Sequence, residues 1–141
     1  MLEKSSLLNY ARQRDMPATK MRGIIREYLH VLMLKQIYHS EYSEDYFFTG
    51  GTSLRLIDGI KRFSEDLDFY SLISTEDEFE ALVDDIMKGT RQYGIEGQYT
   101  IYKRGTLLTA DINFRDIEKH YGIEMRKKSG LMIKVESAVP G

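Results

Sequence analysis

Two stretches of the sequence carry most of the information about its fold and chemistry: residues 48–54, which read FTGGTSL, and residues 62–69, which read RFSEDLDF. The first stretch leads a short apolar run into a glycine turn that can seat a phosphate. The second contains two acids that can hold a metal ion. Because the two stretches lie about one short helix apart, together they point toward chemistry on a nucleoside triphosphate.

The glycine turn supplies the phosphate-binding half of this prediction. Gly50 and Gly51 have no Cβ, so the backbone can approach a phosphate closely. The N–H groups that open a following helix favour an anion. Thr52 and Ser53 add hydroxyl donors and can cap a helix that runs to Gly59. The spacing is not that of a P-loop, and an ordinary capped turn is the structural alternative.

The two acids supply the metal-binding half. In a strand, Asp66 and Asp68 point to one face while Leu67 and Phe69 point to the other. Carboxylates held side by side repel each other unless a cation or a proton lies between them. Mg²⁺ suits this pair, because it takes one or two carboxylates and completes its shell with waters and substrate phosphates. A calcium loop is excluded, because its glycine position, counted from Asp66, is Ser71. Two solvated acids at a strand end are the alternative.

A two-metal site usually needs a third carboxylate from another strand. We expect Glu136 in this role, since it lies on the polar side of a predicted strand whose apolar residues are Leu131, Ile133 and Val135. Asp111 is the rival, because it also lies on a strand face opposite apolar side chains. Both could instead be surface acids.

Composition limits the class of protein. The 141 residues suit one domain, and 42% apolar with 30% charged residues is typical of a soluble globular chain. No apolar run reaches the ~18 residues of a membrane span, and no signal peptide opens the chain. The chain contains no cysteine, which fits a reducing cytoplasm. The net charge is −2, so a nucleic acid would have to be attracted by local charge.

The periodicity of the sequence predicts the order helix, strand, helix, strand, helix, then strands. This order indicates an α+β domain whose mixed sheet is packed by helices. The expected helices cover residues 20–40, 52–59 and a span that begins at Thr75 and ends near Gly89 or Gly94. The expected strands cover residues 46–49, 63–70, 95–103, 106–114 and 131–136.

Four smaller expectations concern the termini and the aromatic and imidazole groups. Asp15 and Pro17 are placed to open a helix. His30, His39 and His120 have no metal-ligand spacing and are expected on the surface of helices or loops. Tyr99 and Tyr102 lie on a predicted hairpin, where they could stack a base. The chain stops soon after a well-patterned strand, so we expect residues 1–141 to lack a C-terminal helical region.

These residues resemble the AbiEii/AbiGii-type toxin family of the nucleotidyltransferase superfamily. The resemblance covers roughly residues 20–137. It rests on residues 50–54 (GGTSL) and 62–69 (RFSEDLDF), with residues 26–30 (REYLH) before them and 134–136 (KVE) after them. It implies the fold of the minimal nucleotidyltransferases.

The resemblance also implies a reaction, in which a nucleoside monophosphate moves from an NTP to an acceptor. In this family the acceptor can be RNA, notably tRNA, and the enzyme often is the toxin of a toxin–antitoxin or phage-defence pair. Carried over residue by residue, Asp66, Asp68 and Glu136 would bind Mg²⁺ or Mn²⁺. The β- and γ-phosphates would be held by residues 50–53, chiefly Gly51 and Ser53, while Arg62 would neutralise phosphate charge.

Two other functions fit the same residues. A catalytically inactive module of the same fold would bind nucleotide or a partner protein without turnover. A metal-dependent phosphohydrolase would share the acids but release inorganic phosphate without an acceptor. Calorimetry with Mg²⁺ and each NTP, combined with an activity assay, separates the three.

Overall fold

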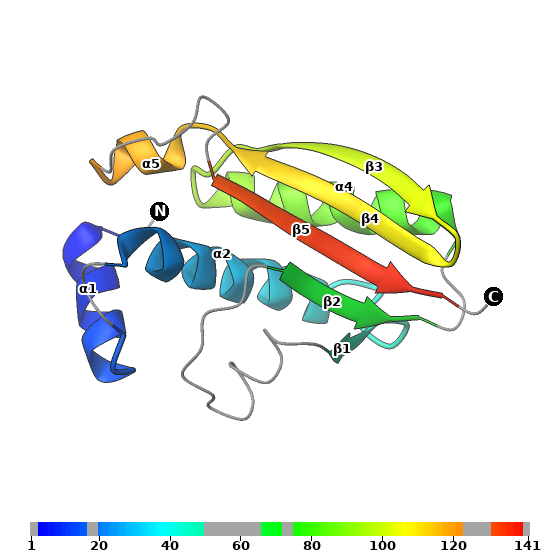
Figure 1. Ribbon diagram of the computed structural model, residues 1–141, viewed down its shortest axis with the longest axis horizontal. Helices are drawn as coiled ribbons and strands as arrows, with labels where there is room; N and C mark the ends of the chain where they lie inside the picture. The colour runs from blue at the N-terminus through cyan, green and yellow to red at the C-terminus, as the bar shows by residue number, and fades with distance from the viewer. Residues whose placement is uncertain (1–2, 17–19, 50–65, 72–74, 123–130, 140–141) are drawn as a thin grey trace.

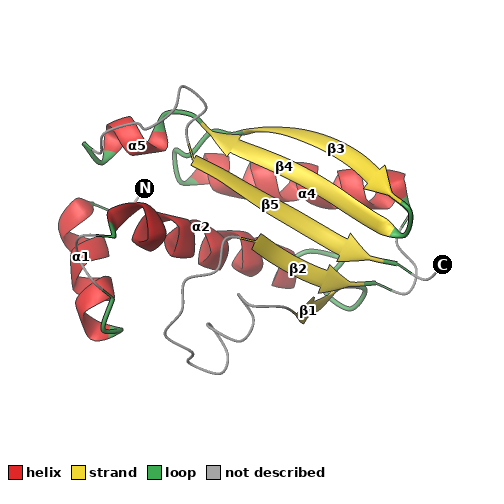
Figure 2. Ribbon diagram, in the orientation of Figure 1, coloured by secondary structure: helices red, strands yellow, loops and turns green. Residues whose placement is uncertain are grey.

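The computed structural model describes residues 3–16, 20–49, 66–71, 75–122 and 131–139. Within them the chain forms a five-stranded mixed sheet in the order β1-β2-β5-β4-β3, with helices packed on one face (Figures 1 and 2). The strands are β1 (Phe47–Thr49), β2 (Asp66–Tyr70), β3 (Gln98–Arg104), β4 (Leu107–Phe114) and β5 (Leu131–Ala138). The helices are α1 (Lys4–Gln13), α2 (Met21–Tyr38), α4 (Glu76–Gln92) and α5 (Ile117–His120). The predicted α+β class with a mixed sheet is confirmed.

The sheet owes its mixed character to one parallel pair. β2 and β5 run parallel, whereas β1–β2, β4–β5 and β3–β4 are antiparallel. β2 and β5 are far apart in the sequence, yet they lie next to each other near the middle of the sheet (Figure 1). This pairing brings residues 66–70 beside residues 134–138.

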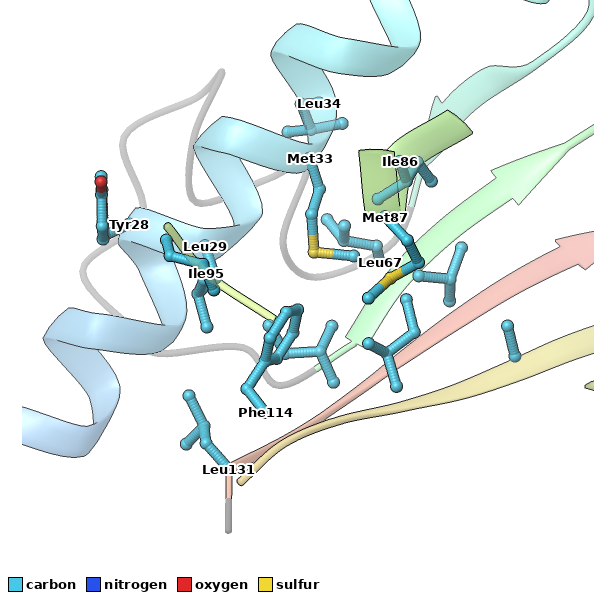
Figure 3. Close-up of a cluster of buried hydrophobic side chains, with 14 of the residues drawn as sticks. Tyr28, Leu29, Met33, Leu34, Leu67, Ile86, Met87, Ile95, Phe114 and Leu131 are labelled. Atoms are coloured by element: carbon cyan, nitrogen blue, oxygen red, sulfur yellow. The ribbon is translucent and has the colours of Figure 1, made fainter. Parts of the chain in front are cut away.

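The hydrophobic core lies between the sheet and the helices α2 and α4. Strands β2 and β5 bury alternate residues, as expected for strands with one face in the core. Figure 3 shows side chains of α2, including Leu29 and Met33, directed toward Leu67, Phe114 and Leu131 of the sheet. These side chains are almost completely inaccessible to solvent. The helices therefore cover one face of the sheet and leave the other to its polar residues.

Local signals fix both ends of α4. Thr75 precedes the helix, and its side-chain oxygen accepts a hydrogen bond from the backbone N–H of Glu78, 3.2 Å away. At the other end Gly94 has φ +76°, which suits glycine. The N–H groups of Gly94 and Ile95 donate to the carbonyls of Arg91 and Thr90, which is a Schellman motif. The predicted helix start at Thr75 is confirmed, and Gly94 rather than Gly89 ends it.

The hairpin and the strands follow the sequence closely. β3 and β4 pair as the expected hairpin around Gly105, which has φ +55°. The strands expected at residues 46–49 and 131–136 appear as β1 and β5, and Asp66–Tyr70 is the described part of the strand expected over 63–70. The helix expected over 52–59 lies outside the described residues.

One expectation near the N-terminus is wrong, and one helix there was not predicted. Asp15 does not open a helix: it follows α1 with φ +54°, a left-handed conformation that aspartate tolerates better than most residues. Helix α1 itself was not expected, since within it only Leu7 and Ala11 are buried. Pro17 lies outside the described residues.

The predicted surface position of one histidine is also wrong. His39 and His120 are exposed as expected, but His30 is only 1% exposed. Its spacing from Met33 and Ile37 places it on the buried side of α2. In the described part of the chain, no helix is long and apolar enough to cross a membrane.

Candidate active site

The face of the sheet opposite α2 and α4 carries the predicted acids. Because paired residues on neighbouring strands point to the same side, the register defines rows of side chains across this face. One row contains Asp68 of β2 opposite Glu136 of β5. The next row contains Asp66 opposite Lys134. The parallel pairing of β2 with β5 therefore brings together acids that are far apart in the sequence.

Asp68 and Glu136 meet directly. Their side chains share a hydrogen bond, and Asp66 is close enough to add to the negative potential. Burial, the charges of Glu136 and Asp66 and this hydrogen bond raise the pKa of Asp68 from 3.8 to about 6. Two half-buried carboxylates in contact favour a proton or a cation between them. The fold therefore brings Asp68 and Glu136 together, although they are far apart in the sequence.

The rival acid occupies a different position. Asp111 of β4 pairs with Lys134, whereas Thr109 is the β4 residue opposite Glu136. Asp111 is therefore one row and one strand away from the carboxylate pair. Its Oδ1 atom is buried and has no hydrogen-bond partner among the described residues. Of the two candidates, Glu136 is therefore the one that lies next to Asp68.

The phosphate-binding residues predicted from the sequence fall outside the described residues. These residues are Gly50, Gly51, Thr52, Ser53 and Arg62. The described chain reaches Thr49, the last residue of β1, which pairs with Asp68. Gly50 is bonded directly to Thr49, so the glycine stretch starts from a residue that lies across from the acids.

The carboxylates of Asp68 and Glu136 are suited to a divalent ion whose remaining ligands come from water and from a substrate. In the described part of the chain, no group of three His, Cys, Asp or Glu side chains is arranged to hold a metal ion, so Asp66, Asp68 and Glu136 do not form a complete three-ligand site in this structure. Mg²⁺ does not require such a group, since it commonly takes one or two carboxylates together with waters and phosphates. The contact between Asp68 and Glu136 supplies two hard oxygen ligands of this kind.

The polar residues of β4 were overlooked as a group. Thr109, Asp111 and Asn113 lie on the uncovered face, and Thr109 is only 1% exposed. The alternation of these residues with Leu108, Ala110 and Ile112, which are buried in the core, is visible in the sequence. The polar face therefore extends from Asp68 across β5 to β4.

Most of the chain is similar to a known protein family. Residues 32–139 match the family described as nucleotidyl transferase AbiEii toxin, type IV TA system. No curated protein sequence matches the chain.

Solved structures share the fold. MenT4, a nucleotidyltransferase toxin from Mycobacterium tuberculosis H37Rv, is 21% identical with a TM-score of 0.63, and the match covers 98% of this chain. JHP933 from Helicobacter pylori is 20% identical with a TM-score of 0.57, and the match covers 83% of this chain. In both cases the match spans 44% of the length of the other protein.

Proposed function

This chain belongs to the AbiEii nucleotidyltransferase toxin family, and from that premise we propose that the uncovered face of its sheet transfers a nucleoside monophosphate from an NTP to an acceptor hydroxyl. The observation that carries the proposal is the contact between Asp68 and Glu136 on this face, with Asp66 beside them. Acids arranged in this way are suited to binding metal and triphosphate.

The divalent ion is part of the proposal. Asp68 and Glu136, with Asp66 in the next row, would hold Mg²⁺ or Mn²⁺ together with phosphates of the substrate. When bound, the ion neutralises charge on the triphosphate and on the departing pyrophosphate. The phosphates would be held further by residues 50–53 and by Arg62. The role proposed for residues 50–53 is supported by Thr49, which pairs with Asp68 and directly precedes Gly50 in the sequence.

The protein groups would position the acceptor and take its proton. In the transfer, the acceptor oxygen forms a bond to the α-phosphorus, and the bond from the α-phosphorus to the bridging oxygen breaks. The electron pair of that bond leaves with pyrophosphate. In this proposal Glu136 also accepts the acceptor proton, a role supported by its position on the open face next to Asp68. Phosphoryl chemistry asks little more of a protein than this positioning and charge neutralisation.

The biological setting follows from the family. The family description names a type IV toxin–antitoxin system. We propose that the acceptor is RNA, tRNA in particular, and that a cognate antitoxin counteracts the enzyme. A role in phage defence and a cytoplasmic location complete the proposal.

The test is a transfer assay with four α-³²P-labelled NTPs, Mg²⁺ and total tRNA. We expect label to enter RNA with the unchanged protein. Asp66→Asn and Asp68→Asn should lower this rate at least about a thousandfold, because each removes charge that the triphosphate and ion require. Tyr70→Phe is the matched control, since Tyr70 lies at the end of the same strand and is 42% exposed.

The outcomes separate the competing functions. Circular dichroism spectra should show that all variants keep the fold. Unchanged transfer by Asp68→Asn would refute the proposed site. Binding of NTP without turnover on any acceptor would support the inactive module instead. Release of inorganic phosphate without an acceptor would identify a phosphohydrolase.

A further inference from the structure

The row of side chains that contains Asp68 and Glu136 crosses the whole sheet. From Glu136 it continues to Thr109 of β4 and then to Tyr102 of β3. In the other direction, Asp68 pairs with Thr49 of β1. Because residues paired across a sheet share a face, these side chains all lie on the uncovered face. The acids therefore lie in the middle of a row that ends on Tyr102 at one edge strand and on Thr49 at the other (Figure 1).

The two tyrosines of β3 lie on opposite faces of the sheet. Tyr99 pairs with the buried residue Ile112, and its hydroxyl donates a hydrogen bond to Asp84 of α4, so Tyr99 faces the helices. Tyr102 comes three residues later and therefore faces away from them. Tyr99 packs against the hydrophobic core, whereas Tyr102 is not among the described side chains that do so. Of the two tyrosines expected to stack a base, only Tyr102 shares a face with the acids.

A cation lies over the ring of Tyr102. Arg104 is two residues further along β3 and therefore on the same face, and its Cζ atom is 5.6 Å from the centre of the Tyr102 ring. Arg104 is exposed, and no acid among the described residues forms an ion pair with it. The ring and the guanidinium together offer a planar surface and a positive charge to a ligand on the uncovered face.

The chemistry of the proposed transfer indicates which substrate lies near Tyr102. In an in-line displacement, the acceptor oxygen approaches the α-phosphorus from the side opposite to the departing pyrophosphate. In the proposed reaction the phosphates are held by residues 50–53, which directly follow Thr49. The acceptor is then expected on the other side of the acids, toward Thr109 and Tyr102. Tyr102 is two strands from Glu136, which is about 10 Å at the usual strand spacing, so a nucleotide can extend from one to the other.

We propose that Tyr102 and Arg104 bind the acceptor RNA. A base stacks on the surface that the tyrosine ring and the guanidinium form together, and the guanidinium neutralises an adjacent phosphate. Such a local positive charge is needed to attract RNA, because the net charge of the chain is −2. The role of this RNA as the acceptor rests on the proposed transferase function, whereas its binding at Tyr102 does not require turnover.

The test measures the affinity for a 5′-fluorescein-labelled single-stranded RNA tetranucleotide by fluorescence anisotropy, with Mg²⁺ present and NTP omitted so that no transfer occurs. Tyr102→Leu keeps an apolar side chain but removes the ring, and it should weaken RNA binding about tenfold. Tyr102→Phe keeps the ring and should bind as the unchanged protein does. The control is Tyr38→Leu, the same change at the exposed end of α2, which should also bind normally. Equal affinity of Tyr102→Leu and the unchanged protein, or no RNA binding by the unchanged protein, would overturn the proposal.

Arg104→Gln tests the electrostatic part of the proposal. It should weaken binding and reduce the magnitude of the slope of log K against log salt concentration by about 0.7, the value for one phosphate contact with a single strand. Tyr102→Leu should leave this slope unchanged. Arg12→Gln removes the same charge from an exposed position on α1 and is the control. Figure 1 shows α1 and the turn between β3 and β4 at opposite ends of the molecule. An unchanged slope in Arg104→Gln would overturn the phosphate contact.

Binding of NTP and turnover separate this inference from the transferase proposal. Tyr102→Leu should bind each NTP with unchanged affinity, and in the transfer assay it should raise the KM for RNA more than it lowers kcat. A loss of NTP affinity equal to the loss of RNA affinity would assign the ring to the incoming nucleotide and overturn its assignment to the acceptor. RNA binding that depends on Tyr102 but is followed by no transfer would refute the transferase and still support this RNA site.

Discussion

The two faces of the central strands differ: one packs in the hydrophobic core and the other carries the acids. On β2, Leu67 and Phe69 are almost completely buried against the helices, whereas Asp66 and Asp68 are half-buried on the uncovered face. On β5, Val135 is buried while Glu136 stands beside Asp68. A single alternating strand thus provides both the core and the carboxylates.

In β2, the residues that stabilise the fold therefore differ from the acidic residues of the candidate site, although the two kinds alternate along the strand. The apolar residues are stabilised by packing, so replacing one of them with a smaller residue should destabilise the protein. The polar face brings like charges together, which is unfavourable for folding without an ion. Substitutions one residue apart should therefore have opposite effects on stability.

The largest expected effect on stability comes from Leu67→Ala. Leu67 is 0% exposed and lies between the two acids in the sequence. The substitution should lower the free energy of unfolding by about 2–5 kcal/mol, through lost burial and the cavity left behind. Urea denaturation of Leu67→Ala and Asp66→Asn makes the comparison, and Asp66→Asn should change stability by less than about 1 kcal/mol. Equal losses in both variants would break the contrast between the faces.

The second prediction separates the two candidates for the third acid. Glu136→Gln should weaken Mn²⁺ binding about 10- to 100-fold, because it removes one of the two carboxylates that meet on the open face. Asp111→Asn is the matched variant and should have a much smaller effect, since Asp111 pairs with Lys134 one row away. Electron paramagnetic resonance of free Mn²⁺ measures both affinities. A larger loss with Asp111→Asn would assign the role to Asp111.

The third prediction concerns pH. The pKa of Asp68 is raised from 3.8 to about 6 in the folded chain, so the folded state binds more protons than the unfolded state between these values. The free energy of unfolding should therefore fall as the pH rises from about 4 to 6. Asp68→Asn should remove this slope and be more stable at pH 7.5 by about 1 kcal/mol, a value reduced for solvent screening. If the free energy of unfolding changed with pH in the same way in both proteins, the raised pKa of Asp68 would be contradicted.

The sequence predicted most of the fold because its elements are strongly patterned. The alternation in residues 131–136 and the capping pair Thr75 and Glu78 are local signals that survive in the structure. Helix α1 was missed because only Leu7 and Ala11 mark its buried side. His30 was misplaced because a polar residue on the buried side of a helix needs partners that only tertiary structure supplies.

The candidate site was predictable in part. Asp66 and Asp68 share a face through the two-residue period of a strand, which sequence alone reveals. Their pairing with Glu136 depends on the parallel register of β2 with β5, which no local pattern specifies. The phosphate-binding role of residues 50–53 and Arg62 stays a prediction.

The central claim is that the acids of the uncovered face hold a divalent ion. The most direct test is the free energy of unfolding at pH 7.5 with and without Mg²⁺, at matched ionic strength, for the unchanged protein and Asp68→Asn. At ten times its dissociation constant, Mg²⁺ should stabilise the unchanged protein by about 1.4 kcal/mol. It should not stabilise Asp68→Asn measurably at the same concentration. Equal stabilisation of both proteins, or none of the unchanged protein, would contradict the account.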